Sequence, residues 1–177
     1  MRATVLEELA AVEPLDDIER RHLADARAWI HSGAELYRLQ KPATPPKHLV
    51  SYFPILDEGH ILLVDHRNAR RWLPAGGHVE PDEHPRETVR RELLEELGVD
   101  LPPGAIGPPI MVTVTPTVGA GSHVDVSLWY AVRGRRSDPV AIDHVEFEDA
   151  RWFPLDGVPL ARTDPHLSRF ILKWANR

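Results

Sequence analysis

Apolar residues recur along the chain with two different periods, and the period predicts which segments form helices. The segment from Asp16 to about Ser32 carries apolar residues at helical spacings and begins at an aspartate that can cap a helix. Gly33 either ends this helix or only interrupts it, because Ala34–Gln40 could continue in the same conformation. A second helix is expected over His166–Ala175, where it would close the chain.

Strands are expected where short apolar or alternating runs are bounded by turn residues. Pro54 lies inside the first run and argues for a bulge or an edge position, because proline cannot donate a backbone hydrogen bond. Glycine-containing turns separate the first two runs and the next two, which predicts two hairpins. The expected strands are Leu49–Leu56, His60–His66, Ile110–Val118, His123–Val132 and Phe147–Phe153.

Pro85–Leu97 has the clearest helical pattern in the chain. Proline suits the first helical position, and Gly98 suits the residue just after the end. The glycine-rich segment Trp72–Glu80 is expected to be irregular, with a brief strand near Val79. Strands therefore precede and follow the Pro85–Leu97 helix. This order favours a mixed sheet flanked by helices over a doubly wound nucleotide-binding fold.

Composition and charge exclude several classes of function. The 177 residues carry a net charge of −6, whereas a protein that binds nucleic acid through its phosphates usually has a basic surplus. No apolar run approaches the roughly 20 residues of a membrane span, and the acidic start of the chain does not resemble a signal peptide. The absence of cysteine excludes disulfides and thiolate metal ligands. We therefore expect a cytoplasmic protein with no DNA or membrane partner.

Three glutamates share one face of the Pro85–Leu97 helix. At about 100° per residue, Glu92, Glu95 and Glu96 fall within one arc beside an apolar stripe. Their repulsion costs roughly a few tenths of a kcal/mol per pair, and the C-terminal end of a helix favours cations instead. A bound divalent cation would turn this repulsion into a chelate, and oxygen ligands suit Mg²⁺ or Mn²⁺. The helix alone leaves open a solvated ladder of ion pairs, such as Arg91 with Glu95.

The residues before this helix favour the metal site over the ladder of ion pairs. Together with the helix they match the pattern G-x5-E-x7-R-E-U-x-E-E-x-G-U, in which U is an apolar residue, at every defined position. The segment Gly77–Val99, called the motif segment below, resembles the Nudix box, and the chain resembles the Nudix hydrolase family. The matching residues are Gly77, Glu83, Arg91, Glu92, Leu93, Glu95, Glu96, Gly98 and Val99.

The resemblance implies a fold and a division of the chain. The family has an α/β fold, an α/β/α sandwich around a mixed β-sheet, and the flanking strands and the late helix fit that description. Residues 46–177 would form the Nudix hydrolase domain. Residues 1–45 lie outside the resemblance and are expected to form an N-terminal helical extension and linker, which would serve in packing or in a homodimer interface.

The resemblance also implies a pyrophosphohydrolase that acts on acid anhydrides in phosphorus-containing compounds. Glu83 and Arg91 would form a pair that orients the helix relative to its loop. Asp82 stands where the family often has glycine, and His84 replaces the usual Ser or Thr cap, which predicts a weaker cap. The implied ligands of Mg²⁺ or Mn²⁺ are Glu92, Glu95, Glu96 and the backbone carbonyl of Gly76.

The implied reaction is attack of water on a phosphorus of the diphosphate linkage in a nucleotide or nucleotide-sugar substrate. A carboxylate takes the proton of the water, and Glu96 or Glu92 is the expected base. In the family the base often lies on a later loop. The candidates there are Glu146, Glu148 and His144, and an ordinary polar surface loop is the alternative for all three.

Further substrate contacts are predicted outside the glutamates, although solvated arginines and buried rings would explain the same residues. None of them selects one leaving group. The alternative function is a non-catalytic Nudix-fold module that binds a nucleotide in regulation, and the intact set of glutamates counts against it. RNA decapping is disfavoured by the acidic balance. The predicted substrate contacts are Arg70, Arg71, His78, Tyr52 and Trp129.

Overall fold

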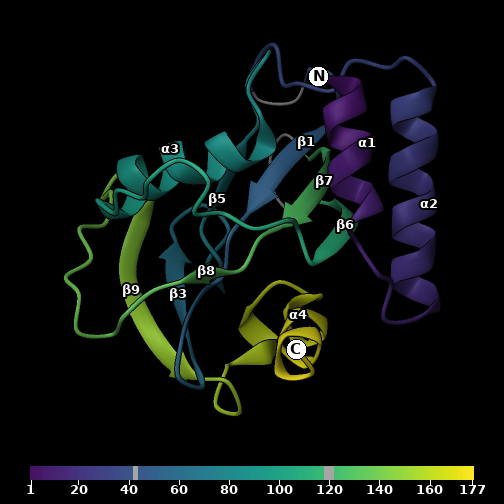
Figure 1. Ribbon diagram of the computed structural model, residues 1–177. Helices are drawn as coiled ribbons and strands as arrows, with labels where there is room; N and C mark the ends of the chain where they lie inside the picture. Colours follow the sequence, from purple (N-terminus) through teal and green to yellow (C-terminus); the bar gives the residue numbers. More distant parts are fainter. Residues whose placement is uncertain (42–43, 118–121) are drawn as a thin grey trace.

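The computed structural model describes residues 1–41, 44–117 and 122–177 (Figure 1). Within these ranges, no helix is long and apolar enough to cross a membrane. The helices are α1 Arg2–Ala10, α2 Asp17–His31, α3 Pro85–Leu97 and α4 Leu167–Ala175, with a short 3-10 helix η1 at Leu160–Arg162. The strands are β1 Lys47–Tyr52, β2 Ile55–Asp57, β3 His60–His66, β4 Arg71–Leu73, β5 Gly76–His78, β6 Met111–Pro116, β7 Val124–Trp129, β8 Val132–Arg133 and β9 Phe147–Pro154.

The strands form two sheets, and the chain crosses from one sheet to the other. One sheet has the order β5-β1-β7-β6, and β1 and β7 run parallel within it. The other has the order β4-β3-β2-β8, with β9 paired to β3. Both sheets mix parallel and antiparallel pairs. The prediction of an α/β fold with mixed β structure and helices on both sides is confirmed.

Two of the predicted strands are each divided between the sheets. The run Leu49–Leu56 breaks at Phe53-Pro54, so that β1 belongs to one sheet and β2 to the other. Pro54 has no N–H to give to a ladder, but its carbonyl accepts a hydrogen bond from the backbone of Val132 at 3.0 Å. The run His123–Val132 breaks in the same way after Trp129. The predicted continuous strands are therefore wrong at these two crossings.

Helices cover opposite faces of the sheets and define two hydrophobic clusters. Figure 1 shows α3 and α4 on opposite sides of the strands. Val89, Leu93 and Leu97 of α3 pack into the larger cluster, together with apolar residues of α1 and α2. Leu167 and Phe170 of α4 pack into the smaller cluster on the other face. Because the apolar stripe of α3 packs into the core, the adjoining face of the helix carries its glutamates toward the edge of the sheet.

The N-terminal segment packs against both the first sheet and α3. The predicted cap of α2 is present, because Asp16 Oδ1 accepts hydrogen bonds from the backbone of Ile18 and Glu19 at 3.0 and 2.9 Å. Gly33 ends the helical region with a φ of +80°, so Ala34–Gln40 does not continue it. Helix α1 was not expected from the sequence. Its buried Glu8 interrupts the apolar pattern that would otherwise have revealed a helix.

Glu8 links α1 to the start of α3. Its carboxylate accepts hydrogen bonds from Arg86 Nε at 3.0 Å and from a terminal nitrogen of the same guanidinium at 2.6 Å. The hydroxyl of Tyr130 donates a third hydrogen bond, at 3.0 Å. Glu8 is 5% exposed. A buried carboxylate held by three donors therefore joins the N-terminal segment to the motif helix.

The second predicted hairpin is present as β6 and β7, which pair antiparallel from Met111 and Trp129 to Pro116 and Val124. Its expected turn, Gly119-Ala120-Gly121, lies outside the described residues. The closing helix α4 agrees with the prediction to within one residue at its start. Just before that helix, Asp164 Oδ1 accepts a hydrogen bond from the backbone of His166 at 2.7 Å.

Candidate active site

Helix α3 begins and ends at the residues expected from the sequence. His84 Nδ1 accepts a hydrogen bond from the backbone of Arg86 at 3.1 Å, so the imidazole supplies the cap that Ser or Thr would have given. Gly98 has a φ of +67°, the left-handed conformation that lets the last carbonyls of the helix find partners. Asp82 is also left-handed, with a φ of +62°. The loop and helix of the motif segment are therefore held at both ends by local interactions.

Arg91 is the hub of the motif segment. Its guanidinium donates two hydrogen bonds to the Glu83 carboxylate, of 2.9 and 3.0 Å, and a third to the backbone carbonyl of His78 at 3.2 Å. Glu83 accepts further hydrogen bonds from the hydroxyl of Thr88 at 2.7 Å and the backbone of Glu80 at 3.1 Å. Although partial burial opposes it, this set of donors lowers the pKa of Glu83. The structure thus brings the two residues of the expected orienting pair together.

Glu92 lies directly over the glycine strand β5. A Cβ placed on Gly77 would lie 1.9 Å from Glu92 Oε1 and 2.1 Å from its carboxyl carbon. A Cβ on Gly76 would meet the backbone oxygen of Ser51 at 2.8 Å. Gly77 therefore leaves room for the Glu92 carboxylate against bare backbone, and Gly76 lets β5 lie close to β1. Burial raises the pKa of Glu92, although Arg91 Nη1 lies 2.7 Å from its Oε1 and opposes that shift.

Glu96 is the most buried of the three glutamates. Its side chain is 5% exposed, and Oε2 is buried without a hydrogen-bond partner among the described residues. Burial, together with the negative charges of Glu92, Glu146 and Asp143, raises the pKa of Glu96 to about 9, and a backbone hydrogen bond from Gly76 offsets only part of that rise. Burial of a carboxylate beside other acidic groups is costly. These residues fit a divalent cation, which would supply both the missing partner and the missing positive charge.

Glu95 and the later loop complete the acidic group. The Glu95 side chain is 58% exposed and lies 3.3 Å from Arg91 Nη1, so it faces outward from the same helix. The backbone of Asp143 donates to the carbonyl of Glu96 at 2.9 Å, which holds the later loop against the end of α3. Glu146 follows on that loop, and its charge acts on both Glu92 and Glu96.

The other two candidate bases both contact Arg67. The Glu148 carboxylate lies 2.6 Å from an Arg67 guanidinium nitrogen, and the backbone carbonyl of His144 accepts a hydrogen bond from Arg67 Nε at 2.9 Å. Of the three loop candidates, Glu146 is the one whose charge acts on the motif glutamates.

The predicted substrate contacts fall into different surroundings. Trp129 is fully buried, packs between Tyr52 and Phe170, and donates its indole N–H to Thr113 at 2.9 Å. Trp129 therefore packs in the core beneath Tyr52. Tyr52 is partly exposed above it, and burial raises the pKa of its hydroxyl well above the usual value. The negative charges of Asp164, Asp125 and Glu96 raise that pKa further, so Tyr52 lies among the acidic groups of this face.

The two predicted arginines also differ. Arg71 donates to the backbone carbonyl of Thr163 at 2.9 Å, which ties the start of β4 to the segment before α4. Arg70 is exposed and has a φ of +53°, an uncommon conformation for a residue other than glycine. Its side chain remains available to solvent at the edge of the loop.

His78 lies in a group that the sequence only partly revealed. His48, His78, His123 and Asp125 bring their nitrogen and carboxylate atoms within 4.8 Å of one another. Because side chains alternate along a strand, the sequence sets His123 and Asp125 on the same side, but nothing local places His48 with them. The parallel register of β1 and β7 does so, because it sets His48 directly beside Asp125.

Arg38 is a second charged group that the sequence did not single out. Partial burial lowers the pKa of its guanidinium, while the charges of Asp125, Glu146 and Glu92 raise it. The residue thus lies near both the histidine group and the motif glutamates. It comes from the non-helical segment that links α2 to β1.

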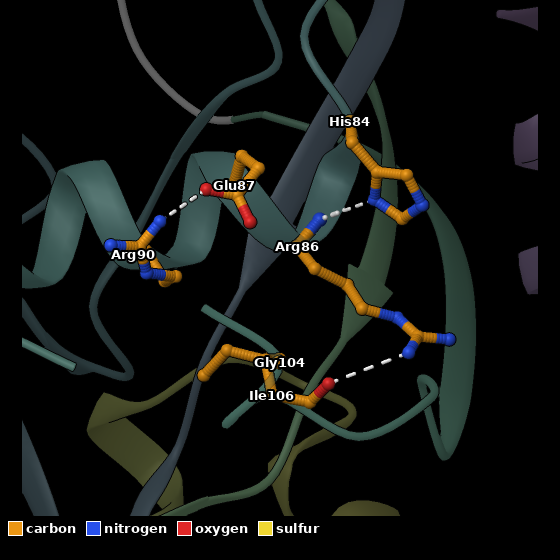
Figure 2. A pocket seen from close by; sticks show the side chains of 6 residues that line it. All are labelled: His84, Arg86, Glu87, Arg90, Gly104 and Ile106. Carbon is orange, nitrogen blue, oxygen red and sulfur yellow. Dashed lines mark hydrogen bonds and ion pairs between the residues drawn. The ribbon is translucent and has the colours of Figure 1, made fainter. Parts of the chain in front are cut away.

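A surface cavity of about 140 Å³ lies at the start of α3, away from the glutamate face. Figure 2 shows its lining, in which Arg86 reaches the backbone carbonyl of Ile106 and Arg90 pairs with Glu87. At about 100° per residue, these arginines project from a different side of α3 than Glu92 and Glu96 do. Their charges are already matched, so this cavity does not extend the acidic site.

Comparison with known proteins connects this geometry to a family. A family model described as the NUDIX domain matches residues 46–174. A curated relative, the NAD-capped RNA hydrolase NudC of Stutzerimonas stutzeri, is 27% identical over 135 residues. That alignment covers 70% of this chain but only 46% of the relative, so the chain spans about half the length of the protein it matches.

Solved structures share the fold. A MutT NUDIX hydrolase from Burkholderia pseudomallei is 25% identical, with a TM-score of 0.55, and the match covers 72% of this chain and 96% of that one. The NUDIX domain of Shewanella oneidensis NrtR, solved in complex with ADP ribose, is 22% identical with a TM-score of 0.57. That match covers 73% of this chain and 86% of the other.

Proposed function

The chain belongs to the NUDIX domain family, and on this premise we propose that it is a metal-dependent hydrolase that cleaves the diphosphate linkage of a nucleoside diphosphate derivative. The observation that carries the proposal is the state of Glu96. Its buried Oε2 has no hydrogen-bond partner among the described residues, and Glu92 and Glu146 surround it with negative charge. A cation shared with its neighbours would stabilise such a group in its ionised form.

The glutamates and Arg91 of the motif segment have separate roles in this proposal. Glu92, Glu95 and Glu96 would hold Mg²⁺ or Mn²⁺, together with the backbone carbonyl of Gly76. Arg91 and Glu83 would position the helix against the loop, so that the carboxylates keep their relative places. When bound, divalent cations neutralise the oxygens of the diphosphate and lower the pKa of the attacking water.

Proton transfer falls to a carboxylate of the same group. Water attacks one phosphorus of the diphosphate, the P–O bond to the bridging oxygen breaks, and the proton of the water passes to a carboxylate oxygen. Glu96 and Glu92 are the first candidates for that base. Glu146 is the candidate outside the motif segment, because its charge acts on both of them.

The substrate is proposed only as a class. The relatives named above act on or bind NAD-capped RNA and ADP ribose, and both of these contain a diphosphate joined to a nucleoside. Tyr52 and Arg70 are proposed contacts, because both are at least partly exposed near the acidic face or its neighbouring loop. The acidic balance of the chain favours a small nucleotide over a long nucleic acid.

The test is a turnover screen with product identification. Purified protein with Mg²⁺ is offered ADP-ribose, NAD, a nucleoside triphosphate, a dinucleoside polyphosphate and a nucleotide sugar, and the products are separated and identified by mass spectrometry. Reaction in ¹⁸O-labelled water identifies the phosphorus that is attacked. The proposal expects cleavage between two phosphorus atoms of at least one of these compounds.

Variants then assign the roles of the glutamates. Glu96→Gln and Glu92→Gln are expected to lower kcat by about 10²- to 10⁴-fold, the range for loss of a general base or of metal binding. Glu95→Gln is expected to abolish metal-dependent hydrolysis while the fold survives. Glu87→Gln is the matched control, since Glu87 lies on the same helix and pairs only with Arg90 among the described residues. Wild-type turnover in Glu96→Gln would refute the proposal.

The screen also separates the alternative function. A regulatory module would bind one of these compounds and leave it intact with every divalent cation supplied. Tight binding without products, measured by calorimetry on the same preparation, would replace the hydrolase proposal with the non-catalytic one.

A further inference from the structure

Four potential metal ligands meet at one end of the first sheet, outside the group of motif glutamates. His48 lies on β1, Asp125 on β7 and His78 at the end of β5, while His123 immediately precedes β7. Their side chains extend from the same face of the sheet. His78 pairs with Val50, which lies two residues from His48 and so shares its face. His48 in turn pairs with Asp125, which lies two residues from His123. This group, called the histidine cluster below, has no part in the proposed hydrolysis.

Three distances within the histidine cluster are close to those of ligands around a small ion, and all four donor atoms lie within 4.8 Å of one another. His48 Nε2 lies 3.0 Å from His78 Nε2 and 3.5 Å from Asp125 Oδ1. His123 Nε2 lies 3.1 Å from the same Asp125 oxygen. A tetrahedral ion with bonds of about 2.0–2.1 Å keeps its ligands roughly 3.3 Å apart. The three measured separations bracket that value.

The remaining ring nitrogens of His48 and His123 have partners that orient these two imidazoles. His48 Nδ1 lies 3.0 Å from the backbone carbonyl of Pro45, so that nitrogen carries the proton and donates it. His48 Nε2 is then a lone pair that points into the histidine cluster. His123 Nδ1 lies 3.4 Å from the hydroxyl of Thr117. A carbonyl or hydroxyl on the far nitrogen is the arrangement that orients metal-binding histidines in proteins.

Asp125 is the carboxylate on which two of the imidazoles converge. Its Oδ1 is buried and lies within 3.5 Å of nitrogens of His48 and His123, and the carboxylate interacts with His123 through a side-chain hydrogen bond. Nitrogen atoms that converge on a carboxylate oxygen at these distances also suit an ion placed between them. The fully buried His48 gives the cluster a rigid base, since its side chain is 0% exposed.

The protonation states agree with this geometry. Burial lowers the pKa of His48, and it lowers the pKa of His78 to about 3, with the charge of Arg38 acting in the same direction. Neutral imidazoles are the form that binds metal ions. Burial raises the pKa of Asp125, and nearby His123 and Arg38 oppose that rise. A cation in the cluster would favour the ionised carboxylate.

We propose that His48, His78, His123 and Asp125 form a closed tetrahedral site for a transition-metal ion of the Zn²⁺ class. Three imidazoles and one carboxylate suit Zn²⁺ better than the oxygen-preferring Mg²⁺. The four protein ligands leave no position for a water, which makes the site structural. His78 directly follows Gly77, so the ion fastens the start of the motif segment to β1 and β7.

The first test is metal content and coordination in the wild-type protein. Chain stripped with chelator and dialysed is expected to retain one Zn²⁺ after re-addition at micromolar concentration, measured by elemental mass spectrometry. Replacement with Co²⁺ is expected to give the intense visible absorption of tetrahedral cobalt. Failure to retain Zn²⁺, or a weak spectrum typical of six-coordinate cobalt, would overturn the proposal without any variant.

Variants then locate the ion. His123→Gln and Asp125→Asn alter two of the three partly exposed ligands, and each is expected to weaken Zn²⁺ binding more than about 100-fold, beyond the effect of losing an outer partner. His31→Gln is the control, because His31 is an exposed histidine on α2. Circular dichroism checks that each variant folds. Unchanged Zn²⁺ affinity in both cluster variants would refute the site.

A double variant of the motif segment separates this proposal from the proposed function. Glu92→Gln combined with Glu96→Gln removes two of the proposed Mg²⁺ ligands and leaves the histidine cluster intact. Zn²⁺ retention is expected to persist in that protein even though Mg²⁺-dependent hydrolysis is lost. Loss of Zn²⁺ together with the glutamates would place the ion among them and overturn the histidine site.

Discussion

Gly77→Ala tests whether the glycine strand exists to make room for Glu92. The added Cβ would lie 1.9 Å from Glu92 Oε1, 2.1 Å from its carboxyl carbon and 2.5 Å from its Cγ. An ordinary contact begins near 3.4 Å, so the carboxylate must withdraw by roughly 1.5 Å. The obstacle is a side chain that can rotate, and the backbone of β5 can stay where it is.

The expected cost is therefore mainly one of activity. A displacement of about 1 Å in a positioned catalytic group lowers turnover by roughly 10²-fold, so kcat of Gly77→Ala should fall by at least that factor. Its free energy of unfolding should fall only by about 1 kcal/mol, the lower end for an added methyl group in a packed site. Gly76→Ala should differ, because its Cβ meets the backbone oxygen of Ser51 at 2.8 Å. We expect about 3 kcal/mol of destabilisation there.

Steady-state kinetics on the substrate found in the screen, together with urea unfolding, measures both quantities. Gly107→Ala is the matched control, since a Cβ at Gly107 has no atom within 4 Å. A double-variant cycle isolates the cause: in a Glu92→Ala background, Gly77→Ala should have no further effect on kcat. If Gly77→Ala keeps wild-type turnover, or if its effect survives the loss of Glu92, the steric reasoning is refuted.

Three further outcomes follow from the contacts. Glu8→Ala leaves the guanidinium of Arg86 and the hydroxyl of Tyr130 without their acceptor. It should therefore lower the free energy of unfolding, measured by urea titration, by about 2–4 kcal/mol. A change below about 0.5 kcal/mol would show that α1 does not stabilise the domain through Glu8. Arg91→Lys cannot present the two-pronged donor that Glu83 receives and should lower kcat about 10- to 100-fold, whereas unchanged kinetics would remove the orienting role. Dialysis against chelator should abolish hydrolysis and added Mg²⁺ or Mn²⁺ should restore it; persistent activity in the chelated protein would contradict metal dependence.

The motif segment could be predicted because its geometry is local. Helical spacing alone sets Glu92 and Glu96 on one face, and the bounding Pro85 and Gly98 fix where that helix begins and ends. Glu83 reaches Arg91 across only eight positions of sequence. No long-range pairing has to be known for these contacts, so a sequence pattern is sufficient to describe them.

The sheet crossings could not be predicted in the same way. The run Leu49–Leu56 is mostly apolar and shows no regular alternation, so its pattern does not reveal that the chain leaves one sheet at Pro54 and joins another. Pairing of β1 with the parallel β7 connects residues about 80 positions apart and is set by tertiary packing. For that reason His123 and Asp125 were visible as one side of a strand, whereas their neighbour His48 was not.

The N-terminal segment shows what the family pattern omits. The matched family model begins at residue 46, yet Glu8 anchors the start of α3 and Arg38 lies among the charges of Asp125, Glu146 and Glu92. Arginine stays protonated through the physiological range, so Arg38 carries a positive charge next to a group of carboxylates. Fixed positive charge near metal-binding carboxylates attracts the anionic phosphates of a substrate. The electrostatic field over the acidic face therefore depends on residues outside the shared fold, and substrate choice is expected to vary with this segment.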